Sequence, residues 1–283
     1  MRRYLLNPSM PVLLRPDDTV QVGWDPRRAV VVHPPAGLTS GALAALLRGM
    51  QSACSPDEVC GHARRLGVPD PSCASIVAEL FGVLTQAGVL TTGHPVGRTV
   101  TVRIHGRGPL SDLLAGALKC SGTRITHSSQ PHAVVTADRT DLVLLTDALI
   151  ADPRVLRDLH AAEVPHLPVR VRDGTGLVGP LVIPGVTSCL ACADRHRRDR
   201  DAAWPAVAAQ LRHTVGAADR ATLMGTAALA LNQVDRVVRA LRCADDPLGI
   251  PDPPMTLDTT LEFDVGSGSV LARRWSRHPG CPC

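Results

Sequence analysis

The sequence predicts an α/β protein in two parts. Residues 1–94 combine short strands with three helical segments, which is the size and content of a winged-helix module. From residue 95 onward, strands and helices alternate as in a Rossmann-like domain with a parallel sheet. Two close cysteine pairs in this second part indicate a structural zinc site. We therefore expect domains at residues 1–94 and 95–283.

Composition is that of a globular protein and argues against two classes of function. Hydrophobic residues make up 45% of the 283 residues and charged residues 20%, so wholesale disorder is not expected. Aromatic residues make up only 2%, too few for a surface that stacks single-stranded bases. The net charge of +4 comes from arginines interleaved with acids, so we do not expect a nucleic-acid partner.

The sequence carries no signal for a membrane or for export. No apolar stretch reaches the roughly 18 residues of a membrane span. The basic start, Arg2 and Arg3, is not followed by the apolar region of a signal peptide. We therefore expect a cytoplasmic protein whose nine cysteines are buried thiols or metal ligands rather than disulfides.

The first part is expected to contain a ribbon of strands followed by helices. Pro-Asp and Asp-Pro turn signals separate its apolar or alternating runs, and Ser, Thr and Pro residues mark the helix starts. The predicted strands cover residues 11–15, 19–24 and 29–32, and the predicted helices cover 39–50, 55 onward and 72–88. Residues 91–95 are expected to form a linker.

The third helix favours a peptide over DNA as the ligand of the first part. Winged-helix modules bind DNA, but they also bind extended peptides by adding a strand to a sheet edge. Residues 72–90 contain no arginine, whereas helices that enter the major groove usually bring Arg or Lys. The expected peptide contacts are Val30, Val31 and Val32 on the strand edge and Ile76, Val77 and Leu80 on the helix. The three helix residues are core instead if they face inward.

The second part shows the alternation of a parallel sheet, followed by two final strands. The predicted strands cover residues 99–105, 123–126, 133–136, 141–146, 166–171, 255–265 and 269–275. The predicted helices cover residues 111–119, 152–162, 203–212 and 220–242. The last helix has a broad apolar surface, which is expected to be core or a homodimer interface.

The cysteine pairs predict a closed metal site. Cys189 and Cys192 form a CxxC, and Cys281 and Cys283 form a CxC. Four thiolates satisfy a tetrahedral structural zinc, and each short spacing lets both sulfurs face one ion. A redox-active CxxC and four unconnected thiols are the alternatives.

A glycine loop lies between the first strand and the first helix of the second part. There, Gly106 and Gly108 would let the backbone approach a phosphate at the helix N-terminus. The motif is incomplete, because Ser111 replaces the third glycine and Pro109 removes a backbone donor. The acidic residue that would hold a ribose about 20 residues further on is also absent.

Asp147 follows the apolar strand 142–146 and is the weak catalytic candidate. Ligands of open α/β sheets gather beyond the carboxyl ends of the strands, so Asp147 is a candidate for Mg²⁺ or substrate binding. A helix N-cap or turn aspartate before residues 148–150 is the alternative.

Residues 176–192, together with the cysteine pair at 281–283, resemble the ThiF/MoeB-like, ubiquitin-activating-type family. The first part and residues 278–283 resemble more specifically its actinobacterial branch of leader-peptide-binding proteins from azoline-forming (TOMM) pathways. The resemblance covers essentially the whole chain from Leu6 onward. It implies a structural zinc, a recognition element for a ribosomally made precursor peptide, a YcaO-type cyclodehydratase as partner, and homodimer formation.

Departures from that family predict that catalytic activity is reduced or lost. Its activating enzymes hold ATP and Mg²⁺ with an acidic residue after the second strand, a helix bearing Asn and Arg, and a lysine. Here residues 127–132 leave no room for a crossover of about 10–12 residues, and the only lysine is Lys119. Gly106, Gly108 and Asp147 remain as a weak site for ATP and Mg²⁺.

The sequence therefore predicts a non-catalytic or catalytically reduced scaffold. It is expected to bind a leader peptide and to present it to a partner enzyme that modifies it. The alternatives are an ATP-dependent enzyme that adenylates the C-terminal carboxylate of a polypeptide and a winged-helix DNA-binding regulator.

Overall fold

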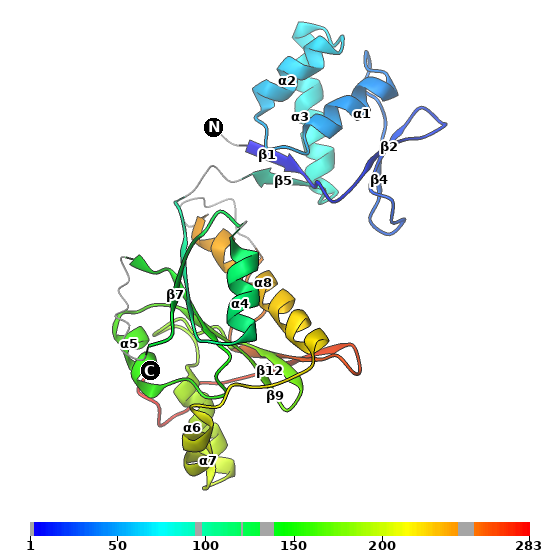
Figure 1. The fold of residues 1–283 in the computed structure, drawn as a ribbon. Coiled ribbons are helices and arrows are strands. Elements are labelled where there is room, and N and C mark those ends of the chain that lie inside the picture. Colours follow the sequence, from blue (N-terminus) through cyan, green and yellow to red (C-terminus); the bar gives the residue numbers. More distant parts are fainter. Residues whose placement is uncertain (1–2, 94–97, 120, 131–138, 243–251) are drawn as a thin grey trace. The chain divides into compact units, whose positions relative to one another are not determined.

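The chain forms two compact units, residues 1–97 and 98–283 (Figure 1). The computed structural model describes residues 3–93, 98–119, 121–130, 139–242 and 252–283. Strand 133–136 of the sequence prediction lies outside the described residues. No helix in the described ranges is long and apolar enough to cross a membrane.

The first unit contains the predicted ribbon and a second strand pair. An antiparallel sheet of order β2-β3-β4 is formed by Val12–Leu14, Val20–Val22 and Val30–Val32. Strand β1 (Arg3–Leu6) pairs antiparallel with β5 (Leu90–Gly93). The linker prediction at 91–95 is therefore wrong for residues 91–93, because pairing with β1 supplies their backbone hydrogen bonds.

Two of the three helices of the first unit begin where their capping residues predict, whereas the third begins at Asp70, two residues before the predicted Ser72, and has no side-chain cap. Thr39 accepts a hydrogen bond from the backbone of Ala42, and Ser55 and Glu58 form a capping box, each cap being worth about 1 kcal/mol. The helices are α1 (Ser40–Gly49), α2 (Pro56–Arg65) and α3 (Asp70–Gln86). With the sheet they enclose one apolar core, which includes the fully buried Leu6, Val20, Leu43 and Leu84.

The second unit is built on a seven-stranded sheet of order β12-β11-β10-β9-β8-β6-β7. Strands β6 to β9 run parallel, which confirms the predicted Rossmann-like core, and β10 to β12 add antiparallel strands at one side. The parallel strands are β6 (Thr101–His105), β7 (Arg124–Ser128), β8 (Leu142–Thr146) and β9 (His166–Arg172). The antiparallel ones are β10 (Thr175–Val178), β11 (Thr259–Asp264) and β12 (Ser269–Arg274).

Helices cover both faces of this sheet. The central strand β8 is buried along its whole length, as a strand between two helical layers must be. On one face, Leu142 and Leu144 pack in a cluster with α4 (Pro109–Leu118) and α8 (Arg220–Arg242). On the other face, Val143 and Leu145 pack with α5 (Pro153–Ala161) and α6 (Leu190–Arg200). The buried side of α8 is therefore core, while the homodimer stays a prediction.

The unit's stability should depend on this central strand. Leu144 is fully buried, so Leu144→Ala should lower the free energy of unfolding by about 2–5 kcal/mol in a denaturant titration. Leu271→Ala, at a position that is 64% exposed, should change it by less than about 0.5 kcal/mol. Equal effects of the two substitutions would contradict the packing described for β8.

Candidate metal centre and strand-end cavity

The four cysteines predicted as metal ligands come together in the second unit. Cys189 is the N-cap residue of α6, and Cys192 lies in the first turn of the helix. The Sγ atom of Cys189 lies 3.7 Å from that of Cys192 and 3.6 Å from that of Cys281, and the Cys192 and Cys283 sulfurs are 3.3 Å apart. All four sulfurs lie within 4.8 Å of one another, so the alternative of unconnected thiols is wrong.

These distances fit a tetrahedral metal ion. Zn–S bonds of about 2.3 Å place the sulfurs of such a site about 3.8 Å apart, whereas a disulfide requires about 2.05 Å. The four residues are free thiols, and two of them are buried. Burial raises the pKa of Cys189, so a thiolate there needs a neighbouring cation. A metal ion held by these four sulfurs would have a complete tetrahedron and no position for water, which is the arrangement of structural sites.

A set of polar contacts holds residues 275–283 against α6. The Nε2–H of His278 donates to Asp199 at 2.8 Å and lowers the pKa of that carboxyl, while Nδ1 accepts from the backbone N–H of Gly280 at 3.0 Å. Arg277 donates to the carbonyl of Gly185 at 2.5 Å. Both ring nitrogens of His278 are therefore engaged, so His278 anchors the segment that brings Cys281 and Cys283 to the cluster.

Removing two of the sulfurs should release the ion and destabilise the unit. Replacing Cys281 and Cys283 together by Ser should abolish stoichiometric metal, measured by mass spectrometry of the metal content. It should also lower the free energy of unfolding by at least ~2 kcal/mol in zinc buffer, because the ion binds only the folded protein. Cys60→Ser makes the same chemical change in the first unit and is the control; equal metal content in both proteins would contradict the site.

The carboxylate of Asp147 occupies the backbone N–H groups that follow the glycine loop. This carboxylate is 2% exposed and accepts the backbone N–H groups of Leu110 at 2.9 Å and Ser111 at 3.1 Å, together with the Ser111 hydroxyl. These N–H groups are the free donors at the N-terminus of α4, which a phosphate would otherwise use. The capping alternative thus describes Asp147, although it caps α4 rather than residues 148–150.

Gly106 and Gly108 let the loop approach Asp147 closely enough for these hydrogen bonds. A Cβ atom at Gly108 would lie 2.7 Å from the carboxylate of Asp147, and one at Gly106 would overlap the carbonyl oxygen of Thr146. Both positions are therefore restricted to glycine by contact with the end of β8. The glycine pattern in the sequence reflects this packing within the chain.

A cavity of about 300 Å³ lies beyond the carboxyl ends of the parallel strands. Arg107, Arg170 and Arg212 line it together with a single carboxylate, that of Asp152. Arg170 is only 9% exposed, and within the described residues its guanidinium has no hydrogen bond or ion pair. Burial lowers its pKa to about 10, so it remains a cation at neutral pH. The cavity therefore suits a small anion, and its signal in the sequence is Arg170, which stands between two valines of β9.

The peptide contacts predicted in the first unit fall into two groups. Val31 is 43% exposed on the edge strand β4, with Val30 and Val32 on either side of it. Ile76, Val77 and Leu80 are 8%, 2% and 3% exposed and belong to the apolar core. The inward-facing alternative therefore describes the three helix residues. The exposed side of α3 carries Glu79 and no basic residue, which gives the DNA-binding alternative no support.

Comparison with known proteins finds similarity of fold but not of sequence. No protein-family model and no curated protein sequence matches the chain. A heterocyclase in complex with substrate and cofactor superposes with a TM-score of 0.67 at 15% identity, over 100% of this chain and 39% of that one. The heterocyclase TruD gives 0.66 at 17% identity, over 100% and 42%. Escherichia coli MccB with ATP gives 0.57 at 12% identity, over 99% of both chains.

At these identities the similarity shows the fold alone. The chain spans only 39% and 42% of the two heterocyclases that it matches. The match nevertheless extends over both units of this chain, so the order of a small N-terminal unit and a Rossmann-like unit is shared.

Proposed function

We propose that the chain is a scaffold that binds a precursor peptide through its first unit and presents it to a separate modifying enzyme. The observation that carries the non-catalytic part is the closure of α4 by Asp147, because the donors expected to bind a phosphate are already used. The shared fold with heterocyclases supports an azoline-forming (TOMM) context. The four-cysteine site is proposed to hold zinc with a structural role.

The peptide-binding site that we propose is the free edge of β4. Arg15 donates its N–H to Thr19, and Gly23 donates to Pro11, so the odd-numbered residues of β3 hydrogen-bond toward β2. Val20 and Val22 therefore face β4, where they pair with Val32 and Val30. It follows that the N–H and C=O groups of Val31 point to the open side, ready to pair with an added strand.

The opposite edge of the same sheet is less accessible. Arg48 donates to the carbonyl of Val12 at 2.9 Å, and Gln51 donates to that of Met10 at 2.8 Å. Side chains from α1 and the residues after it therefore already occupy acceptors along β2. Within the described part of the chain, no side chain donates to the backbone of β4, which favours this edge for strand addition.

The partner that we propose is a YcaO-type cyclodehydratase. The chain matches only 39% and 42% of the two heterocyclases, whose remaining length lies outside the shared fold. A chain of this fold that acts as a scaffold needs a second protein to supply the chemistry. Binding both the peptide and that enzyme would bring the reacting groups together at a high effective concentration.

Proline at position 31 should weaken peptide binding without unfolding the unit. It removes the outward N–H, which makes no hydrogen bond within the sheet, and edge strands tolerate proline. We expect affinity for a labelled precursor peptide, measured by fluorescence anisotropy, to fall at least about tenfold, or 1.4 kcal/mol. Val31→Thr keeps the N–H and should bind like the wild type. Unchanged binding by Val31→Pro would rule out this edge.

The strand-end cavity favours one alternative, an ATP-dependent adenylating enzyme. Its buried arginine, Arg170, would suit a phosphate or an adenylate. On the scaffold proposal, titrating zinc-loaded protein with millimolar Mg-ATP in a calorimeter should give no saturable heat. Micromolar binding, with pyrophosphate exchange on adding a peptide, would instead establish the adenylating enzyme.

The scaffold proposal also assigns Asp147 a purely structural role. Asp147→Ala leaves the N–H groups at the start of α4 without an acceptor, so the free energy of unfolding should fall by about 1.5–3 kcal/mol. Asp158→Ala, at an exposed carboxylate on α5, should change it by less than about 0.5 kcal/mol. If Asp147→Ala is as stable as the wild type, the carboxylate is not needed for capping and its assignment to Mg²⁺ is restored.

A further inference from the structure

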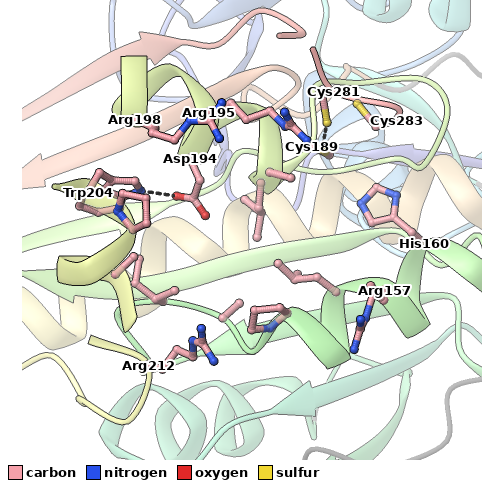
Figure 2. A pocket seen from close by; sticks show the side chains of 18 of the residues that line it. Arg157, His160, Cys189, Asp194, Arg195, Arg198, Trp204, Arg212, Cys281 and Cys283 are labelled. Atoms are coloured by element: carbon pink, nitrogen blue, oxygen red, sulfur yellow. Dashed lines mark hydrogen bonds between the residues drawn. The ribbon is translucent and has the colours of Figure 1, made fainter. Parts of the chain in front are cut away.

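A cavity of about 660 Å³ opens between α5, α6, α7 (Trp204–Leu211) and residues 281–283 (Figure 2). It lies in the second unit and is lined by other residues than the β4 edge and the glycine loop. Apolar side chains of α5 and α6, including Leu156 and Leu190, form its floor. Its volume falls within the range of ligand sites and is enough for a few amino-acid residues.

Helix α7 forms one wall of this cavity and has no buried residue. Its eight residues are apolar except Gln210, and Val207 is 40% exposed. A helix that is apolar on all sides is normally buried, so α7 presents a surface that lacks a covering partner within the described residues.

Contacts at its first residue fix α7 in place. The indole Nε1–H of Trp204 donates to Asp194 at 3.3 Å. The guanidinium of Arg197 pairs with the same carboxylate at 2.8 Å and lies 5.1 Å from the ring centroids of Trp204 and Trp275. The exposed helix is thus held by polar and cation–π contacts rather than by burial, which preserves the cavity wall in the absence of a ligand.

Four arginines surround the apolar floor. Arg195 and Arg198 of α6 lie on one side of the cavity, and Arg157 and Arg212 lie on the other (Figure 2). In the part of the chain that the structure describes, none of the four guanidinium groups has a hydrogen bond or an ion pair, and Asp199, whose pKa Arg198 helps to lower, is hydrogen-bonded to His278. The only acidic side chain in the lining, Asp194, is bound by Arg197 and Trp204. The cavity therefore combines apolar surface with unpaired positive charge.

We propose that this cavity is a docking site for a segment of a partner protein that carries both apolar side chains and carboxylates. The apolar side chains would lie on the floor, and the carboxylates would pair with the arginines, whose planar guanidinium groups bind carboxylates through two hydrogen bonds. A polypeptide fits better than a small acid, because the exposed apolar surface continues past the cavity to Val207. A molecule of the cavity's size would leave that surface uncovered.

The proposal goes beyond the peptide site on β4 and is independent of it. Strand addition at β4 uses backbone groups and neutral valines, whereas this cavity selects for acidic and apolar side chains together. We therefore assign the cavity to a partner protein that the chain binds, and not to the peptide that is modified.

A displayed library of random peptides, selected on the full-length zinc-loaded chain, tests the proposal. We expect enriched peptides to combine Asp or Glu with Leu, Ile or Phe. A synthetic copy should bind Arg198→Glu at least about tenfold more weakly by anisotropy, because the reversed charge repels carboxylates. Arg200→Glu reverses a charge on the same helix outside the cavity and should bind like the wild type. Ala209→Trp, which fills the cavity from α7, should also abolish binding.

These variants leave the fold intact, since Arg198, Arg200 and Ala209 are exposed. Unchanged metal content and thermal unfolding serve as the check for each. The proposal is overturned if no peptide is enriched, if enriched peptides lack acidic residues, or if Arg198→Glu binds them normally. It is also overturned if Val31→Pro removes their binding, which would place them on β4. Dimers that dissociate in Arg198→Glu, seen by sedimentation equilibrium, would assign the cavity to an interface between copies instead.

Discussion

The hydrogen bonds from the start of α4 to the carboxylate of Asp147 are the interaction on which the glycine loop of the second unit depends. Backbone N–H groups at a helix N-terminus attract an anion, and in nucleotide-binding folds that anion is a phosphate. Here the anion belongs to the chain, and it is delivered by the strand next to the loop. Since this carboxylate is part of the chain and nearly fully buried, a phosphate could use the same N–H groups only by displacing it, which would leave a buried charge without donors. The same contact explains the two glycines, which a nucleotide-based interpretation would assign to phosphate binding.

The four-cysteine cluster lies on the opposite face of the sheet. The face covered by α4 and α8 has an extensive apolar cluster. The face covered by α5 and α6 has a smaller one, and Cys189 and Cys192 belong to it. A metal ion bound to these sulfurs would join α6 to residues 281–283, where apolar packing is sparse. The anchors at His278 and Arg277 position that segment for the same purpose.

Features with local signals could be predicted from the sequence, and features that depend on distant residues could not. The helix starts at Ser40 and Pro56 follow from their capping residues, and the cysteine cluster follows from two short spacings. In contrast, the pairing of β1 with β5 joins residues near 4 and 92, and the Asp147 cap joins residues more than 35 positions apart. The apolar period of Ile76, Val77 and Leu80 marks one helix face but does not tell whether a core or a ligand covers it. Only the surrounding strands and helices settle that question.

The positions of the arginines in the folded protein say more about a binding partner than their number does. Along the sequence the arginines are scattered, and the net charge of +4 indicates no particular partner. In the folded unit, four unpaired arginines surround one apolar cavity, and Arg170 lies buried in the neighbouring one. The β4 edge, by comparison, offers backbone groups and valines without charge. Backbone pairing tolerates many sequences, whereas a charged apolar cavity selects one kind of segment. The proposed scaffold would use the two surfaces for different ligands, with the β4 edge for the peptide and the charged apolar cavity for the partner protein.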